Sequence, residues 1–329
     1  MLTRFAVRFV LASTLAGMAH AQSITHGDST FSVTSTAFTP VFSSTFGDAT
    51  WKMDATGPDV AYKYSWYYRQ QRRNTNFQFG ALQTGAIFTQ GRKMRITFTD
   101  NGANPFGEER FNADLVITLK DGPTPNSARL FSKMRVQNSP NNSAGKVFQF
   151  FNLSDLDMPN GTPNASVDDA ATYAPTVITQ TESSSTDVAR MIALNPNRVE
   201  LSSGLTLRNK LASGSASLAN LPGDPIASTT NDNGSAFQWT VTLAVGEWAT
   251  LYHGLAYNLP AYAQDPCPAD LHADDVVDDN DFVQFAAAYN ELLCPELPAF
   301  CDADLNDDGF VDDSDFVLFA GAYNELLCP

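Results

Sequence analysis

Six residues near the C-terminal end have the types and spacing of a calcium-binding loop. They occupy positions 1, 3, 5, 7, 9 and 12 of a twelve-residue stretch, and they are Asp304, Asn306, Asp308, Phe310, Asp312 and Asp315. Ca²⁺ takes six to eight oxygen ligands, which alternating side chains and one backbone carbonyl, here that of Phe310, can bring to one point. Gly309 at position 6 permits the sharp turn. The stretch predicts a Ca²⁺ site, and a solvated acidic segment is the alternative.

The same loop occurs 34 residues earlier in an altered form. Residues 267–295 match residues 301–329 at 21 of 29 positions. The corresponding ligand positions hold Asp270, His272, Asp274, Val276 through its carbonyl, Asp278 and Asp281. Asp275 replaces the glycine, and the imidazole of His272 suits softer metals than Ca²⁺. We therefore expect the second loop to dominate Ca²⁺ binding. A zinc site of His272 with cysteines is a weaker alternative, because no CxxC spacing supports it.

Each loop is followed by an apolar pattern with helical spacing. Phe316, Phe319 and Tyr323 recur at three- and four-residue steps, as do their equivalents in the first copy, Phe282, Phe285 and Tyr289. Prolines between the copies exclude the entering helix of a full EF-hand. The pattern predicts two loop-plus-helix units whose apolar faces pack against each other.

Two such units in tandem, with Asp at position 12 and no entering helix, resemble the dockerin module of secreted bacterial proteins. The resemblance covers residues 267–329. It implies a small calcium-folded domain with the ligands named above. It also implies docking onto a cohesin-type partner, often in polysaccharide-degrading systems.

All four cysteines lie in this module. A helix from about residue 315 to 327 rises roughly 20 Å, whereas Cys301 reaches only about 10 Å along it, so a bridge within one copy is strained. If the two helices pack antiparallel, each loop lies beside the far end of the other helix. This arrangement predicts the bridges Cys267–Cys328 and Cys294–Cys301.

The net charge and the N-terminal segment limit which partners and which location the sequence allows. The 20 Lys and Arg against 36 Asp and Glu give a net charge of −16, and residues 265–329 contain no Lys or Arg. A nucleic-acid partner is therefore excluded. Residues 1–21 combine Arg4 and Arg8, a short apolar run and Ala19-His20-Ala21, which predicts a signal peptide and secretion. The sequence has no other apolar run long enough to span a membrane.

Residues 22–258 show short runs in which apolar and polar residues alternate. The clearest run places Phe237, Trp239, Val241 and Leu243 on one face of a strand. About ten such runs, with no long helical pattern, predict a large antiparallel β-sandwich. Residues 259–266 read as a linker. The predicted fold class is thus mainly β, a sandwich followed by a small all-α dockerin-like module of two loop–helix repeats.

Residues with catalytic potential are scarce in the sandwich. Its only histidines are His26 and His253, and we find no nucleophile-elbow, zincin or phosphate-loop motif. A carboxylate pair for glycoside hydrolysis stays open, with surface carboxylates as the favoured interpretation. The acidic residues available for it are Glu108, Glu109, Glu182, Glu200 and Glu247.

Two further features have a structural and a functional interpretation. Asp155, Asp157, Asp168 and Asp169 surround Gly161-Thr162, and they form either a second metal site or, as we favour, a polar loop between strands. The alternating aromatic residues form either a sugar-stacking face or, as we favour, a core strand. They are Tyr62, Tyr64, Trp66 and Tyr68.

Two functions of different classes follow. The preferred one is a secreted non-catalytic sandwich that binds a surface or glycan and carries a calcium-stabilised attachment module. The alternative is a polysaccharide-acting hydrolase that its dockerin-like module docks to a partner.

Overall fold

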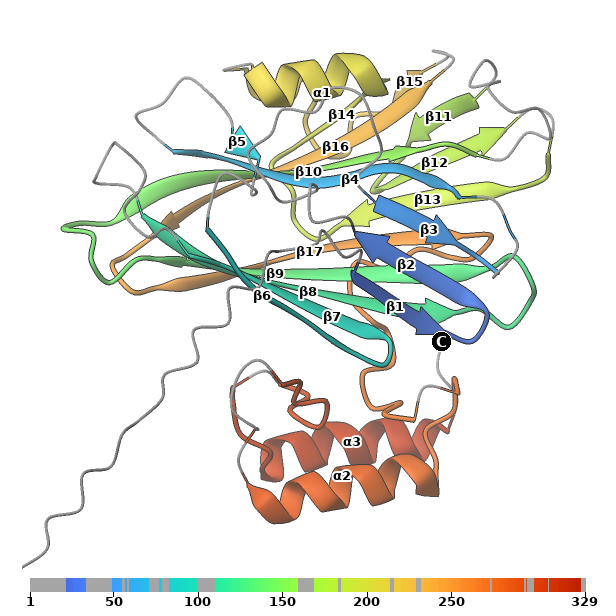
Figure 1. Cartoon of the computed structure of the whole chain (residues 1–329), viewed down its shortest axis with the longest axis vertical. Coiled ribbons are helices and arrows are strands. Elements are labelled where there is room, and N and C mark those ends of the chain that lie inside the picture. Colours follow the sequence, from blue (N-terminus) through green and yellow to red (C-terminus); the bar gives the residue numbers. More distant parts are fainter. Residues whose placement is uncertain are drawn as a thin grey trace, which may run out of the picture.

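The structure is a computed structural model of the chain. It describes residues 22–33, 49–54, 57, 59–70, 77–78, 83–99, 110–158, 169–182, 185–213, 216–228, 232–272, 274–292, 294, 299–306 and 308–326. Within these residues the chain is mainly β, with antiparallel sheets followed by two C-terminal helices (Figure 1). The predicted fold class is confirmed. The predicted signal peptide, residues 1–21, lies outside the described residues.

Two large sheets form the body of the molecule. The larger has nine strands in the order β15-β11-β12-β13-β17-β9-β8-β7-β6, and the other has five in the order β14-β16-β10-β4-β5. A three-stranded sheet, β1-β2-β3, adjoins them. All described strand pairs are antiparallel. The strands are β1 Gln22–His26, β2 Ser29–Val33, β3 Ala49–Lys52, β4 Ala61–Gln70, β5 Phe77–Gln78, β6 Gln83–Gln90, β7 Lys93–Thr99, β8 Phe111–Asp121, β9 Ala128–Asn138, β10 Lys146–Leu156, β11 Asp169–Tyr173, β12 Val177–Glu182, β13 Val188–Ala193, β14 Arg198–Ser203, β15 Ile226–Ser228, β16 Asn233–Leu243 and β17 Trp248–Tyr257.

The main core lies between the two large sheets, because the alternating apolar residues of each strand face inward. On β4, Tyr64, Trp66 and Tyr68 are each at most 4% exposed, and Trp66 stacks on Trp239 of β16 with ring centroids 5.5 Å apart. These three rings are core residues and form no sugar-stacking face. The side chain of Tyr62 is outside the described part.

One helix of the sandwich was not predicted. Helix α1, Gly204–Ser213, lies on the outer face of the five-stranded sheet (Figure 1). Its buried Leu207 and Leu211 pack with Tyr67 and Phe151, whose side chains leave the sheet on that face. Ser203 caps the helix by accepting from the Thr206 N–H at 3.2 Å. Ten residues are too few for the apolar pattern to stand out from that of a strand.

The C-terminal module contains helices α2, Asp279–Glu291, and α3, Asp313–Glu325. They pack antiparallel as the repeat predicts, because the Val277 N–H donates to the Leu326 carbonyl and the Val311 N–H donates to the Leu292 carbonyl. Phe285 stacks on Phe319 with ring centroids 4.7 Å apart. The ring centroids of Phe282 and Tyr323 are 6.5 Å apart. Those of the equivalent pair, Tyr289 and Phe316, are 6.2 Å apart. The predicted bridge Cys294–Cys301 is present, with a Cα–Cα distance of 5.3 Å. Cys328 lies outside the described residues, so the bridge Cys267–Cys328 stays a prediction.

The linker and the module dock against the outer face of the nine-stranded sheet. The Tyr262 carbonyl lies so close to Gly254 of β17 that a Cβ there would come within 1.8 Å of its oxygen. Arg129 of β9 donates to the Pro260 carbonyl at 3.1 Å and stacks over the Tyr262 ring. Among the described residues, no helix is long and apolar enough to cross a membrane.

Candidate functional site

The second loop folds around the carboxylate of Asp315. This side chain is fully buried, and its Oδ1 accepts from the N–H groups of Leu305 at 2.7 Å and Asn306 at 3.0 Å. Its Oδ2 accepts from the Asp312 N–H at 3.0 Å. Asp312 in turn caps α3 by accepting from the Ser314 N–H. Positions 9 and 12 thus tie the loop to the start of its helix.

The earlier positions of this loop also point their oxygens toward the backbone of the loop. The two oxygens of Asp304 accept from the N–H groups of Asp308 at 3.0 Å and Gly309 at 2.9 Å. Gly309 has φ +95°, the left-handed conformation that its position requires. Asn306 Oδ1 accepts from Asp308, and Asp308 Oδ1 accepts from the N–H of Phe310. The loop therefore holds hard oxygen donors, which suit Ca²⁺.

The first loop brings three of its predicted ligands together. Asp270, Asp274 and Asp281 each offer one oxygen, and these oxygens lie within 4.8 Å of one another. Two oxygens bound to one Ca²⁺ at 2.3–2.6 Å can lie up to about 5 Å apart, so the three fit a single ion. Asp278 caps α2, and Asp275 takes the left-handed turn with φ +67°.

His272 does not join a zinc site in the described part of the chain. Its ring is half exposed and lies 3.2 Å from Asp274 Oδ2. The sulfurs of Cys294 and Cys301 are joined to each other and group with Asp304 of the second loop. Because zinc binds thiolates, sulfurs joined in a disulfide are poor ligands.

Lys120 of β8 enters the first loop from the sandwich. Its ammonium lies 2.8 Å from Asp270 Oδ2 and 2.9 Å from Asp275 Oδ1, and it is almost fully buried. Arg92 adds a hydrogen bond to the Asp270 carbonyl at 3.0 Å. Burial alone would lower the pKa of Lys120, but the surrounding carboxylates, Asp265 first among them, outweigh burial and raise it. The sandwich thus supplies a permanent cation to the first loop, which sequence reasoning missed.

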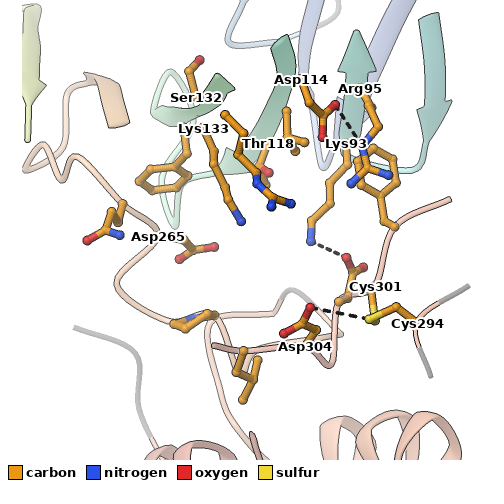
Figure 2. A pocket seen from close by; sticks show the side chains of 18 of the residues that line it. Lys93, Arg95, Asp114, Thr118, Ser132, Lys133, Asp265, Cys294, Cys301 and Asp304 are labelled. Atoms are coloured by element: carbon orange, nitrogen blue, oxygen red, sulfur yellow. Dashed lines mark hydrogen bonds and ion pairs between the residues drawn. A yellow bond between two sulfur atoms is a disulfide. The ribbon is translucent and has the colours of Figure 1, made fainter. Parts of the chain in front are cut away.

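A cavity of about 750 Å³ lies between the outer face of the nine-stranded sheet and the module (Figure 2). Among the described residues that line it, basic and acidic side chains are equal in number, and aromatic rings accompany them. The basic residues are Arg92, Lys93, Arg95, Lys133 and Arg135. The acidic residues are Asp114, Asp265, Asp302, Asp304 and Asp308. The aromatic residues are Phe131, Tyr252 and Phe300.

Sheet and module build this cavity jointly. Lys93 of β7 forms an ion pair with Asp302 of the module. Arg95 stacks over Phe300 with its Cζ 4.9 Å from the ring centroid, and it donates to the Ala299 carbonyl at 2.6 Å. The cavity would therefore lose a wall if the module left the sheet.

Asp114 of β8 is the carboxylate on the sheet side of the cavity (Figure 2). Its Oδ1 lies 3.3 Å from Arg95 Nε and accepts no hydrogen bond from a described residue. Burial raises the pKa of Asp114, although Arg95, Arg135 and Lys133 act in the opposite direction. A carboxyl group with a raised pKa in a cavity is a candidate for proton transfer. Sequence reasoning missed Asp114, because it occupies one of the outward positions of β8, where a polar residue is expected in any strand with one face exposed to solvent.

Among the described residues, the histidines and glutamates considered from the sequence do not assemble a catalytic group. His253 is fully buried, and burial lowers its pKa to about 3. His26 accepts from the Asp121 N–H at 2.8 Å. Glu200 pairs with Lys210, and Glu182 is buried on β12. Glu247 accepts from the Ala244 N–H in a turn. Glu108 and Glu109 lie outside the described residues.

The aspartates around residue 160 separate into two places. Asp155 and Asp157 come together with Asp232, which the sequence did not connect to them. Asp169 lies beside Glu182, its register partner on β12, and accepts from Gln180 Nε2 at 2.8 Å. Asp168 and Gly161-Thr162 lie in residues 159–168, outside the described part, so the polar loop there stays a prediction.

The Asp169 carboxyl predicts a pH dependence of stability. Burial, and after it the hydrogen bond with Glu182, raises the pKa of Asp169 well above its ordinary value. The folded protein then keeps a proton that the unfolded chain releases, so stability falls as pH rises past the ordinary pKa of about 3.9. We expect Asp169→Asn to gain stability over the wild type, by a margin that grows from about pH 5 to pH 8. Urea denaturation in chelating buffer measures this margin, and a margin independent of pH would contradict the raised pKa.

Comparison with known proteins gave structural neighbours only. No family model and no curated protein matches the chain. A protein from Escherichia coli K12 named as an aldose 1-epimerase shares 8% identity and a TM-score of 0.41, covering 74% of this chain and 100% of that chain. A galactose mutarotase related enzyme from Lactobacillus acidophilus shares 9% identity and a TM-score of 0.40, covering 73% of this chain and 98% of that chain. A galactose mutarotase-like protein from Lactobacillus casei shares 8% identity and a TM-score of 0.41, covering 72% of this chain and 99% of that chain.

These neighbours correct the functional prediction. They are named as an aldose 1-epimerase, a galactose mutarotase related enzyme and a galactose mutarotase-like protein, which contradicts the preferred interpretation of a non-catalytic sandwich that binds a surface or glycan. They give no direct support to the polysaccharide hydrolase either. At these identities and TM-scores they assign no activity and no site residue to this chain.

Proposed function

We propose that the chain is a carbohydrate-acting enzyme that binds its substrate in the cavity between the nine-stranded sheet and the C-terminal module. The observation that carries the proposal is Asp114, a partly buried carboxyl group with a raised pKa in the wall of a polar cavity. The described lining residues include equal numbers of cations and carboxylates, so they give no strong preference for a charged ligand. Such walls offer the donors and acceptors that a neutral polyhydroxyl compound needs.

Aromatic rings complete the case for a sugar. Phe131, Tyr252 and Phe300 line the same cavity, and flat rings pack against the C–H faces of pyranoses. Asp114 is then the group that accepts a proton from, or returns it to, a substrate hydroxyl or hemiacetal oxygen. The neighbouring Arg95 stabilises negative charge when the proton leaves.

Replacement of Asp114 tests this role. We expect Asp114→Asn to lower the rate of sugar conversion by about 10²–10⁴-fold, the range for loss of a general acid–base group, while the fold is kept. The measurement is proton NMR of a panel of reducing sugars and short oligosaccharides, with anomeric exchange and new products followed over time. Glu247→Gln, on an exposed turn and not among the residues that line the cavity, is the matched control. An unchanged rate in Asp114→Asn, or no conversion by the wild type, would remove the proposal.

We also propose that the C-terminal module binds Ca²⁺, as its resemblance to dockerins implies. Asp304, Asn306, Asp308, Asp312 and Asp315 would hold an ion in the second loop, with the Phe310 carbonyl. Support comes from the oxygens that these side chains gather around the loop backbone. A bound ion would neutralise carboxylates that otherwise repel one another.

Attachment to a partner is the remaining part of this proposal. The helices carry exposed apolar side chains, with Val283 67%, Val317 68% and Leu318 49% exposed. A cohesin-like protein or another cell-surface partner would cover such residues, and secretion through residues 1–21 would bring the chain to it. The experiment is pull-down of the whole chain with surface protein in Ca²⁺ and in chelator. Capture that does not depend on Ca²⁺ would count against a calcium-folded docking surface.

A further inference from the structure

Three aspartates gather at the end of β10, far from the C-terminal loops in the sequence. Asp155 is the next-to-last residue of β10, Asp157 is the first residue after that strand, and Asp232 immediately precedes β16. Strand β16 pairs with β10 so that Asp155 stands opposite Gly234, which brings Asp232 close. Each aspartate offers one oxygen, and the three oxygens lie within 4.8 Å of one another. We call Asp155, Asp157 and Asp232 the β10 cluster.

The centre of the β10 cluster is a buried carboxylate without hydrogen bonds. Asp155 is fully buried, and neither of its oxygens accepts a hydrogen bond from a described residue. The nearest cation is Arg208, whose Nε lies 3.6 Å from Asp155 Oδ2 and donates instead to the Gly204 carbonyl at 3.3 Å. Lys63 acts at longer range. Buried carboxylates are normally paired, hydrogen-bonded or bound to a metal. Asp155 has the long ion pair with Arg208, but its oxygens accept no hydrogen bond from a described residue.

The backbone next to this carboxylate leaves room for it. A Cβ at Gly204, the first residue of α1, would come within 2.3 Å of Asp155 Oδ2. The Gly204 N–H donates to the Asp232 carbonyl at 2.9 Å, which fixes the residue that supplies the third carboxylate. The start of α1 and two neighbouring strands therefore converge on one point.

We propose that Asp155, Asp157 and Asp232 bind a Ca²⁺ ion in the sandwich, independent of the C-terminal loops. The three oxygens are close enough to share an ion with metal–oxygen distances of 2.3–2.6 Å. An all-carboxylate set favours a hard cation over zinc or copper, which prefer imidazole and thiolate. Ca²⁺ also tolerates irregular geometry, whereas Mg²⁺ demands a near-octahedral one. The ion would tie β10 to β16 and to the start of α1, and it would give the Asp155 oxygens a closer partner than Arg208.

The test uses the full chain in a background that disables both C-terminal loops. Asp274→Ala and Asp308→Ala remove an exposed ligand from each loop without touching the buried Asp281 and Asp315. Bound calcium is counted by elemental analysis after equilibrium dialysis, and melting temperature is measured in Ca²⁺ and in chelator. We expect one ion per chain to remain and Ca²⁺ to raise the melting temperature.

Replacement of Asp155 distinguishes an ion site from a merely buried charge. Asp155→Asn should lose the remaining ion and raise the melting temperature in chelator, because it removes a buried charge whose oxygens accept no hydrogen bond from a described residue. Asp157→Asn, at the exposed rim, should also lose the ion, and it serves if the Asp155 variant does not fold. Asp224→Asn, on an exposed turn, is the matched control. No ion in the loop-disabled protein, or an ion that both variants keep, would overturn the proposal. An equal rise of the Asp155→Asn melting temperature in both buffers would also overturn it.

Discussion

Lys120→Met is expected to lower the free energy of unfolding by about 3–5 kcal/mol in chelating buffer, the range for breaking a buried ion pair from one side. The substitution leaves Asp270, a fully buried carboxylate, without the ammonium that lies 2.8 Å away. It also releases Asp275 from the sheet. Methionine keeps a similar volume, so the loss reports charge more than packing. Denaturant unfolding of the whole chain in EDTA is the measurement.

Saturating Ca²⁺ should restore part of this loss, since an ion in the first loop would neutralise Asp270 in place of the ammonium. Lys210→Met is the matched control. It breaks the more exposed ion pair with Glu200, so it should cost only about 1 kcal/mol or less. Equal losses in the two variants would show that the contact of Lys120 with the first loop contributes no more than the more exposed Lys210–Glu200 pair.

The second large effect concerns Ca²⁺ affinity. We expect the wild type to show one tight C-terminal site, which Asp308→Ala abolishes, and a weaker one from the first loop. The first loop is weakened because an incoming ion must displace Lys120 from Asp270. A hydrogen bond to a charged group contributes about 1.5–3 kcal/mol, so its removal in Lys120→Met should tighten the first loop by about 10–100-fold.

Isothermal titration calorimetry of the wild type, Asp308→Ala, Lys120→Met and the double variant resolves the two loops. The Asp155→Asn background keeps any ion in the β10 cluster out of the count. Two wild-type loops of equal affinity would contradict competition by Lys120. An unchanged first loop in Lys120→Met would contradict it as well.

The C-terminal module could be predicted from the sequence because its determinants are local. The twelve-residue spacing, the repeat and the apolar steps of Phe285 and Phe319 define two similar units, and similar units with one apolar face each pack against each other. The antiparallel packing then led to Cys294–Cys301. The alternation of apolar and polar residues, which is also a local pattern, predicted the strands of the sandwich.

The cavity and the β10 cluster could not be predicted, because they depend on which distant strands become neighbours. Asp114 belongs to a strand whose outward residues look like ordinary solvent-facing positions until the module covers them. Asp155 and Asp232 are joined only by the pairing of β10 with β16. Lys120 likewise meets Asp270 across 150 residues of chain. Composition and local periodicity do not specify which strands far apart in the sequence become neighbours.

The contact between Gly254 and the Tyr262 carbonyl has a mechanical consequence. The linker contacts β17 at Gly254, and Arg129 of β9 binds the Pro260 carbonyl. A force applied to helices α2 and α3 would therefore be transmitted to the sheet within a few residues of the end of β17. Tension applied through an anchor would load the linker in shear along the sheet surface before it could draw the module away. An anchored molecule would therefore present the mouth of its cavity at a fixed angle to the anchoring surface, even under flow.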